Sequence, residues 1–112
     1  MDLVAAMEKD TGVPLRELRV DGGASRDAFL MQFQADMLAT PVRRPVIRET
    51  TALGAAYLAG LAVGIWHDPD ELRRQWRCDV SFLPHMTAEQ REKNRRGWAK
   101  AVGRSLDWAR EE

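Results

Sequence analysis

The chain has 112 residues, with 17 lysines and arginines against 17 aspartates and glutamates, so its formal net charge is zero. A chain of this size buries only about two-thirds of its surface on folding, which allows one small domain with a modest core. Hydrophobic residues make up 45% and charged residues 30%, which argues against a disordered, collagen-like or coiled-coil chain. The balanced charge argues against nucleic acid as a partner.

The cysteine count and the apolar segments indicate the cellular location of the protein. Cys78 is the only cysteine, so it cannot form an intramolecular disulfide. Residues 1–10 carry acids and lack the apolar stretch of a signal peptide. Residues 52–66 are too short for an ordinary membrane span, and we interpret them as a buried helix. We therefore expect a cytoplasmic protein with no membrane partner. His67 and His85 lack zinc-ligand spacing, so no metal site is expected.

The first part of the chain predicts a helix, a strand and a second helix. Residues 2–11 predict a helix that ends at Gly12, with Leu3 and Met7 on its apolar face. Residues 17–21 predict a short strand that ends in two glycines. The helix after it has an apolar stripe at helical spacing, formed by Phe29, Leu30, Phe33, Met37 and Leu38.

The middle of the chain predicts an edge strand and two further helices. Residues 42–46 are extended, and Pro45 suits a strand end. A third helix runs through residues 52–63, capped by Thr50 or Thr51. It is apolar nearly all round, so we expect it to be buried on several sides. A short helix to about Gln75 begins with Asp68 as its cap and Pro69 in its first turn.

The last part predicts a strand and a long helix. Residues 78–82 alternate like a strand, and Thr87 with Gln90 has the spacing of a capping box for a helix to about Ala109. Residues 91–96 are interpreted as a solvated charged face of it. Alternating helices and strands indicate α/β layering, but about three short strands are fewer than a usual sheet has. We therefore expect an incomplete α/β fold.

The segment most suggestive of chemistry is residues 18–27, LRVDGGASRD, in which a strand leads through two glycines into a helix. Gly22 and Gly23 permit positive φ and let a ligand approach the backbone. The first turn of the next helix offers unpaired N–H groups and the positive end of its dipole, which suits a phosphate. The same pattern also serves as a tight connection with no ligand, so spacing alone leaves both interpretations open.

Three stretches resemble a known family: residues 18–24 (LRVDGGA), 29–36 (FLMQFQAD) and 51–64 (TALGAAYLAGLAVG). They resemble the C-terminal end of the FGGY family of carbohydrate kinases, in its glycerol kinase branch, and the tail follows the same pattern. The resemblance implies an actin-like ATPase (ribonuclease H-like) fold of two large domains. ATP and glycerol, or another polyol, would meet between them. Residues 1–112 would be the C-terminal segment of the C-terminal domain.

The resemblance also implies a site for an adenine nucleotide. Gly23 matches the glycine whose backbone contacts the nucleotide, and Gly22 and Ala24 shape that turn. Asp27 stands where well-known members have an asparagine. An aspartate there suits the helix dipole and accepts hydrogen bonds from a ribose or an adenine amino group, but it lacks the amide donor. The alternative for Asp27 is a plain helix-start acid.

The resemblance assigns no catalytic or metal-binding residue to this sequence. In the family, the general base, the polyol-binding residues, the first phosphate loop and the magnesium-binding acid all precede the segment that is matched here. Asp21, Asp36 and Asp79 are interpreted as structural or solvated. Gln90 stands where some relatives have a glutamate that completes a zinc site with a phosphocarrier protein, so neither that partner nor that metal is expected. Phosphoryl transfer needs positioned metal and donor groups, so we expect a segment that binds ATP or ADP with magnesium but is inactive alone.

The alternative is a non-catalytic association module that pairs with the N-terminal portion of a kinase or with itself. The helix that carries Gly60 and Gly64 is apolar all round, and Trp66 and Trp76 lie near it in the sequence. A segment of a larger domain is expected to expose apolar surface that a partner covers, and such patches promote association.

Overall fold

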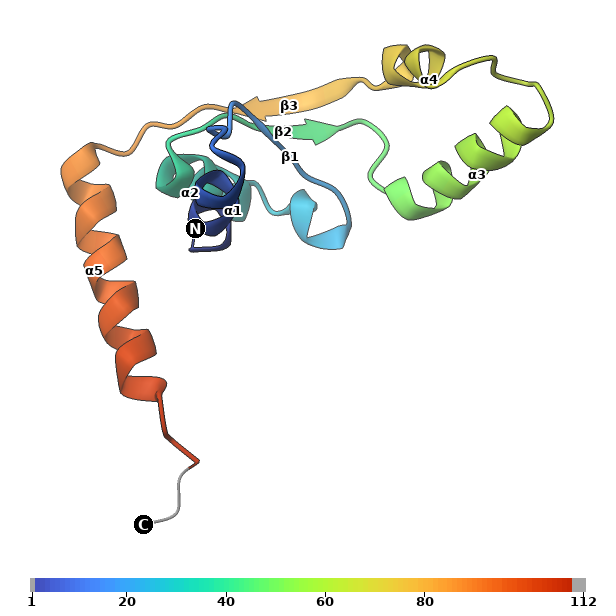
Figure 1. Ribbon diagram of the computed structural model, residues 1–112. Helices are drawn as coiled ribbons and strands as arrows, with labels where there is room; N and C mark the ends of the chain where they lie inside the picture. The colour runs from blue at the N-terminus through green and yellow to red at the C-terminus, as the bar shows by residue number, and fades with distance from the viewer. Residues whose placement is uncertain (1, 110–112) are drawn as a thin grey trace.

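The computed structural model describes residues 2–109, and Figure 1 shows a small sheet with helices at both ends. The order of helices and strands expected from the sequence is confirmed. The elements are α1 (Asp2–Thr11), β1 (Leu18–Arg19), the 3-10 helix η1 (Gly23–Arg26), α2 (Ala28–Leu38), β2 (Val42–Pro45), α3 (Thr50–Ala62), α4 (Pro69–Gln75), β3 (Cys78–Phe82) and α5 (Ala88–Ser105).

The sheet has the order β1-β2-β3, with β2 in the middle. Val42 of β2 pairs with Leu18 of the parallel strand β1 and with Phe82 of the antiparallel strand β3. The register of β2 against β3 shifts between Arg44 and Pro45, where the proline has no N–H to donate to the ladder. The paired part of β1 is shorter than the predicted strand at residues 17–21.

The core lies between α2 and the sheet. Met31 and Ala35 of α2 are four residues apart, so they share one helix face, and both are buried. The predicted apolar stripe is not the face that packs on the sheet, since Phe29 is 80% exposed and Phe33 is 41% exposed. The small Ala35 lets the helix approach the sheet closely, which a phenylalanine there would prevent. The residues that form and flank the core are Met31, Ala35, Val42, Phe82, Leu18, Val20 and Val80.

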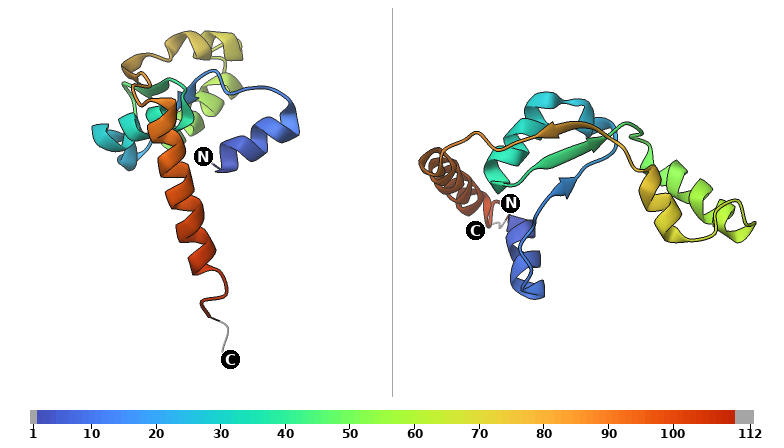
Figure 2. Two further views of the ribbon diagram at one scale, coloured as in Figure 1. Left: turned by 90° about the vertical axis from the view of Figure 1, so that its left-hand side faces the viewer. Right: turned by 90° about the horizontal axis from the view of Figure 1, so that it is seen from above.

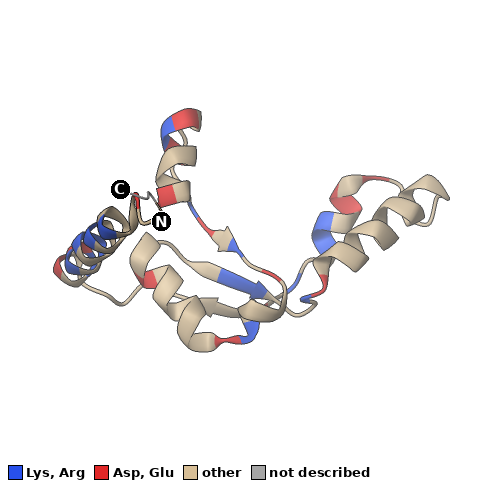
Figure 3. Cartoon of the chain, turned by 90° about the horizontal axis from the view of Figure 1, so that it is seen from below, with Lys and Arg blue, Asp and Glu red and all other residues tan. Residues whose placement is uncertain are grey.

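The helices α3, α4 and α5 spread away from this core (Figure 2). The radius of gyration is 18.5 Å, whereas a compact chain of this length has one of roughly 13 Å. Figure 2 shows α5 leaving the sheet at one end, with α3 and α4 at the other. The expectation that the helix at residues 52–63 is buried on several sides is therefore wrong for this chain. Leu58 is 70% and Val63 is 73% exposed, and Figure 3 shows α3 as a helix without charged residues.

The helices α3 and α4 differ in how their first turns are capped. The predicted cap of α3 is wrong: the N-cap is Glu49, which makes no side-chain capping bond. Thr50 is instead the first residue of the helix, and its hydroxyl donates to the carboxylate of Asp21. The predicted cap of α4 is confirmed, because Asp68 accepts a 2.7 Å hydrogen bond from the N–H of Glu71. A Cβ at Gly60 would overlap the Trp66 ring, which packs directly on the α3 backbone.

The long helix α5 has the predicted capping box, in which Thr87 and Gln90 bond reciprocally. It ends at Ser105 rather than near Ala109, because the backbone turns extended at Leu106 and left-handed at Asp107. The Trp98 indole N–H donates to Asp2 of α1 at 2.8 Å. An open apolar groove of about 1330 Å³ lies between α1, α2 and α5.

Asp36 attaches the start of α5 to α2. Its Oδ1 accepts hydrogen bonds from the backbone N–H groups of His85 at 2.5 Å and Met86 at 3.1 Å. Its backbone carbonyl accepts a 2.9 Å bond from Arg91. The N–H of His85 is the main cause that lowers the pKa of Asp36, and partial burial opposes it. Asp36 is therefore a structural carboxylate, as expected.

This lowered pKa predicts how the attachment responds to acid. A carboxylate whose pKa is lower in the folded state stabilises it above the unfolded value, 3.8, and this contribution is lost as pH falls through the folded value. We expect the amide resonances of His85 and Met86 to titrate with a midpoint below 3.8. The Asp36→Asn variant should not show this step. A midpoint at or above the unfolded value would contradict the assignment.

Candidate functional site

The two-glycine segment forms a turn at the carboxyl end of β1. Gly22 has φ 75° and ψ −178°, a conformation that residues with a Cβ rarely adopt. Gly23 and Ala24 open η1, and the first N–H groups of a helix have no partner within it. The sequence predicted that α2 follows the glycines directly. The 3-10 turn lies between them instead, closed by a 3.2 Å hydrogen bond from Ser25 N–H to the Gly22 carbonyl.

The structure brings the four predicted site residues, Gly22, Gly23, Ala24 and Asp27, together in this one loop. A Cβ built on Gly23 meets no atom within 4 Å, so the space beside it is open. Asp27 is the N-cap of α2, and its Oδ1 accepts a 3.1 Å hydrogen bond from the N–H of Leu30. The helix-start role of Asp27 is thus confirmed, whereas its contact with a nucleotide stays a prediction.

The loop lies on an open surface rather than inside a cavity. A cavity of about 430 Å³ between the β2–α3 connection and α4 is lined by residues such as Arg19, Tyr57 and Trp76, and by none of the four site residues. The apolar groove beside α5 does not include them either. A ligand on this loop would therefore be contacted from one side by the described part of this chain.

Two backbone regions hold the start of the loop. The N–H of Gly22 donates to the carbonyl of Arg48 at 2.9 Å, and Asp21 accepts from the Thr50 hydroxyl. The segment before α3 therefore fixes where β1 ends and the turn begins. Asp21 serves this local structure, which agrees with the structural role expected for it.

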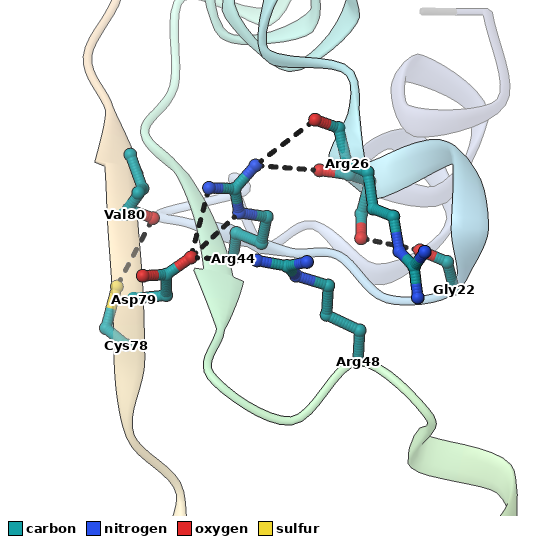
Figure 4. A network of polar contacts seen from close by, with 8 residues as sticks. Gly22, Arg26, Arg44, Arg48, Cys78, Asp79 and Val80 are labelled. Atoms are coloured by element: carbon teal, nitrogen blue, oxygen red, sulfur yellow. Dashed lines mark hydrogen bonds and ion pairs between the residues drawn. The ribbon is translucent and has the colours of Figure 1, made fainter.

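The loop is held from within by Ser25 and from beneath by Arg44 and Asp79. The sequence analysis assigned none of these three side chains to the site, and it interpreted Asp79 as structural or solvated, which agrees with its ion pair. Ser25 is 1% exposed, and its hydroxyl donates to the Gly22 carbonyl at 2.7 Å. Arg44 of β2 donates to the Ser25 carbonyl at 3.2 Å and pairs with Asp79 of β3 at 3.0 Å (Figure 4). Because Arg44 and Asp79 are 35 residues apart, no local pattern signals the pair. Only the register of two strands places them together.

Within residues 2–109, no three His, Cys, Asp or Glu side chains gather in an arrangement that could hold a metal ion. Nor does any helix of that range have the length and hydropathy needed to cross a bilayer.

Comparison with known proteins gives consistent matches. Residues 1–63 match the model of the C-terminal domain of the FGGY family of carbohydrate kinases. Glycerol kinase of Caldanaerobacter subterraneus subsp. tengcongensis is 57% identical over 110 residues, which are 98% of this chain and 22% of that protein. Glycerol kinase of Deinococcus radiodurans is 59% identical over 107 residues, 96% of this chain and 21% of that protein. The chain thus spans about a fifth of the length of these relatives.

Solved structures confirm the predicted fold class. Plasmodium falciparum glycerol kinase with ADP superposes with a TM-score of 0.79 at 38% identity, covering 93% of this chain and 21% of that one. Xylulose kinase from Lactobacillus acidophilus gives a TM-score of 0.65 at 18% identity, covering 83% of this chain and 19% of that one. The second likeness concerns the fold alone. The described residues are therefore part of the actin-like α/β domain found in sugar kinases.

Proposed function

Because the chain belongs to the FGGY family of carbohydrate kinases, we propose that it forms the nucleotide side of an ATP-dependent glycerol kinase. In that reaction a phosphoryl group passes from ATP to glycerol, giving glycerol 3-phosphate and ADP. One observation carries the proposal: the open glycine turn belongs to a chain that superposes, at a TM-score of 0.79, on a glycerol kinase solved with ADP. Residues 1–112 would be the C-terminal segment of such a cytoplasmic enzyme.

Each residue of the loop would contact the nucleotide in its own way. Gly23 has no side chain, so the nucleotide can approach its backbone. Gly22 sets the direction of the turn through its positive φ, and Ala24 offers a backbone N–H beside it. Since Oδ1 of Asp27 already accepts from Leu30, its Oδ2 is the atom that would accept from a ribose hydroxyl.

The same geometry suggests that the chain is inactive alone. Phosphoryl transfer depends on positioning the two reactants and on neutralising the transferring phosphate. The loop supplies a surface on one side of the nucleotide and no assigned base, and the ligands of the magnesium ion would lie outside this chain. We expect no detectable phosphorylation of glycerol by the purified chain under conditions in which a full-length relative is active.

Titration with MgADP tests the nucleotide site directly. We expect binding with a dissociation constant on the order of 1 mM, because contacts from one side supply only a few kcal/mol. In ¹H–¹⁵N spectra the amides of residues 22–27 should shift, whereas those of α5 should not. A folded chain whose loop amides do not move at any attainable MgADP concentration would contradict the proposal. Turnover of glycerol by the chain alone would contradict the expected inactivity.

The exposed apolar surface of α3 favours a second candidate, an association module. Leu58 of α3 is 70% exposed, and Val63 and Ile65, which follow the end of the helix, are 73% and 65% exposed. The helix itself carries no charge. Such a surface is expected to be covered, either by the N-terminal portion of a kinase or by a second copy of this chain. Sedimentation of the purified chain as a monomer over a wide concentration range would count against self-association.

A further inference from the structure

Polar contacts of Arg44 connect the proposed nucleotide loop, residues 22–27, to strand β3. We call the pair of Arg44 and Asp79 the polar bridge. The guanidinium of Arg44, on β2, donates from Nη1 to the carbonyls of Ser25 at 3.2 Å and Arg26 at 3.5 Å. Its Nε and Nη2 donate to Oδ2 of Asp79, on β3, at 3.2 and 3.0 Å. Figure 4 shows the guanidinium between the loop and the strand. The Arg44 side chain thus contacts both the loop and strand β3.

The Arg44 end of the bridge is shielded from water, whereas the Asp79 side chain is 36% exposed. The Arg44 side chain is only 12% exposed, and its guanidinium carbon lies 5.6 Å from the centre of the Phe82 ring. A poorly solvated cation needs an anion and hydrogen-bond acceptors. Asp79 supplies the anion, and it also accepts from Arg48 at 3.3 Å. The loop carbonyls supply the remaining acceptors, so they are bound to a side chain that is itself fixed.

The bridge reaches Gly22 through Ser25. The carbonyl of Ser25 accepts from Arg44, and both the N–H and the hydroxyl of Ser25 bond to the Gly22 carbonyl. We propose that Arg44 and Asp79 are positioning residues that hold the Gly22–Asp27 loop in its nucleotide-binding conformation. This inference rests on the proposed function. Neither side chain is assigned a contact with the nucleotide, and both act through η1.

The neighbouring arginine provides a matched control. Arg43 lies next to Arg44 on β2, but its side chain is 44% exposed and pairs with Glu17 at 3.1 Å. Replacement of either arginine by methionine removes one positive charge from the same strand. Only the Arg44→Met variant removes a contact with the loop.

Amide hydrogen exchange tests the bridge without any ligand. In Arg44→Met and in Asp79→Asn we expect the N–H groups of Ser25 and Asp27 to exchange about tenfold faster, because hydrogen bonds to a charged group are lost. The N–H of Met31 in α2 should change no more than it does in Arg43→Met. Equal exchange at Ser25 in the two methionine variants would overturn the inference. So would an equal acceleration of Ser25 and Met31, since it would show a general loss of stability.

The nucleotide affinity provides the functional readout. Arg44→Met should weaken MgADP binding about tenfold, and Arg44→Lys should recover part of the loss, since it keeps the pair with Asp79 but not the fork of donors. Unchanged affinity in Arg44→Met would overturn the positioning role. If the unsubstituted folded chain binds no MgADP, the proposed nucleotide site is wrong. Amide hydrogen exchange at Ser25 and Asp27 then still tests whether Arg44 and Asp79 hold the loop. The lysine variant serves the same comparison if the methionine variant does not fold.

Discussion

Replacement of Phe82 by alanine is expected to remove most of the free energy of unfolding of the chain. Phe82 is 8% exposed and is one of four hydrophobic residues that form the buried cluster within residues 2–109. Truncation of a buried phenylalanine costs about 3–5 kcal/mol, whereas small domains are stable by about 5–15 kcal/mol. An open chain with so few buried side chains is expected near the lower end of that range. Urea denaturation followed by circular dichroism measures the loss.

Phe29→Ala is the matched control for this substitution. Phe29 is 80% exposed and stacks on Phe33 with a centroid distance of 6.4 Å. Its truncation should change the free energy of unfolding by no more than about 0.5 kcal/mol, as for most surface positions. Equal losses in the two variants would place the core elsewhere than between α2 and the sheet.

Gly23→Val is expected to abolish MgADP binding while the chain stays folded. A Cβ on Gly23 meets no atom within 4 Å, so valine fits the unliganded loop. Its two methyl groups would fill the space through which the nucleotide reaches the backbone. We expect the dissociation constant to rise at least about tenfold, which takes a millimolar site out of the measurable range. Calorimetric titration measures the loss, and the unfolding midpoint shows that the fold is kept.

Gly22→Ala separates this steric effect from backbone strain. Gly22 has φ 75° and ψ −178°, a region that is nearly restricted to glycine, so alanine there is strained by roughly 1–3 kcal/mol although its Cβ meets no atom within 4 Å. We expect this variant to lower the unfolding midpoint, which Gly23→Val should not do. Retained affinity in Gly23→Val would show that the nucleotide does not approach Gly23.

The sequence predicted those elements whose signals are local. The capping box of α5, the Asp68 cap of α4 and the strand at Cys78–Phe82 involve residues within a few positions of one another. Short-range steric and hydrogen-bonding preferences determine such features, so periodicity and cap residues suffice to find them. The two glycines after β1 were found in the same way.

Features that depend on distant contacts were missed or placed wrongly. The hydroxyl of Thr50 bonds to Asp21 rather than to its own helix, which a capping preference cannot anticipate. The α2 face that packs on the sheet contains Met31 and Ala35, because closeness of approach decides between two apolar faces. The apolar residues on all sides of α3 indicate that another surface should cover this helix, but they do not identify that surface.

The candidate site also has a part that the sequence predicts and a part that it does not. The positions of Gly22, Gly23, Ala24 and Asp27 in one turn follow from their proximity in the sequence. The polar bridge from Asp79 to Arg44 follows from the register of β2 against β3, and register is a property of the folded sheet. The residues that shape the loop from below are therefore visible only in the structure.

The placement of β3 affects how the protein behaves at high concentration. Within residues 2–109, β3 is hydrogen-bonded to a strand on one side only. Such an edge offers backbone donors and acceptors to a strand of another molecule, and it can template aggregation. The exposed Cys78 lies at the start of this edge, so in an oxidising solution its thiol is accessible for a disulfide with another molecule. Concentrated samples are therefore best kept under reducing conditions.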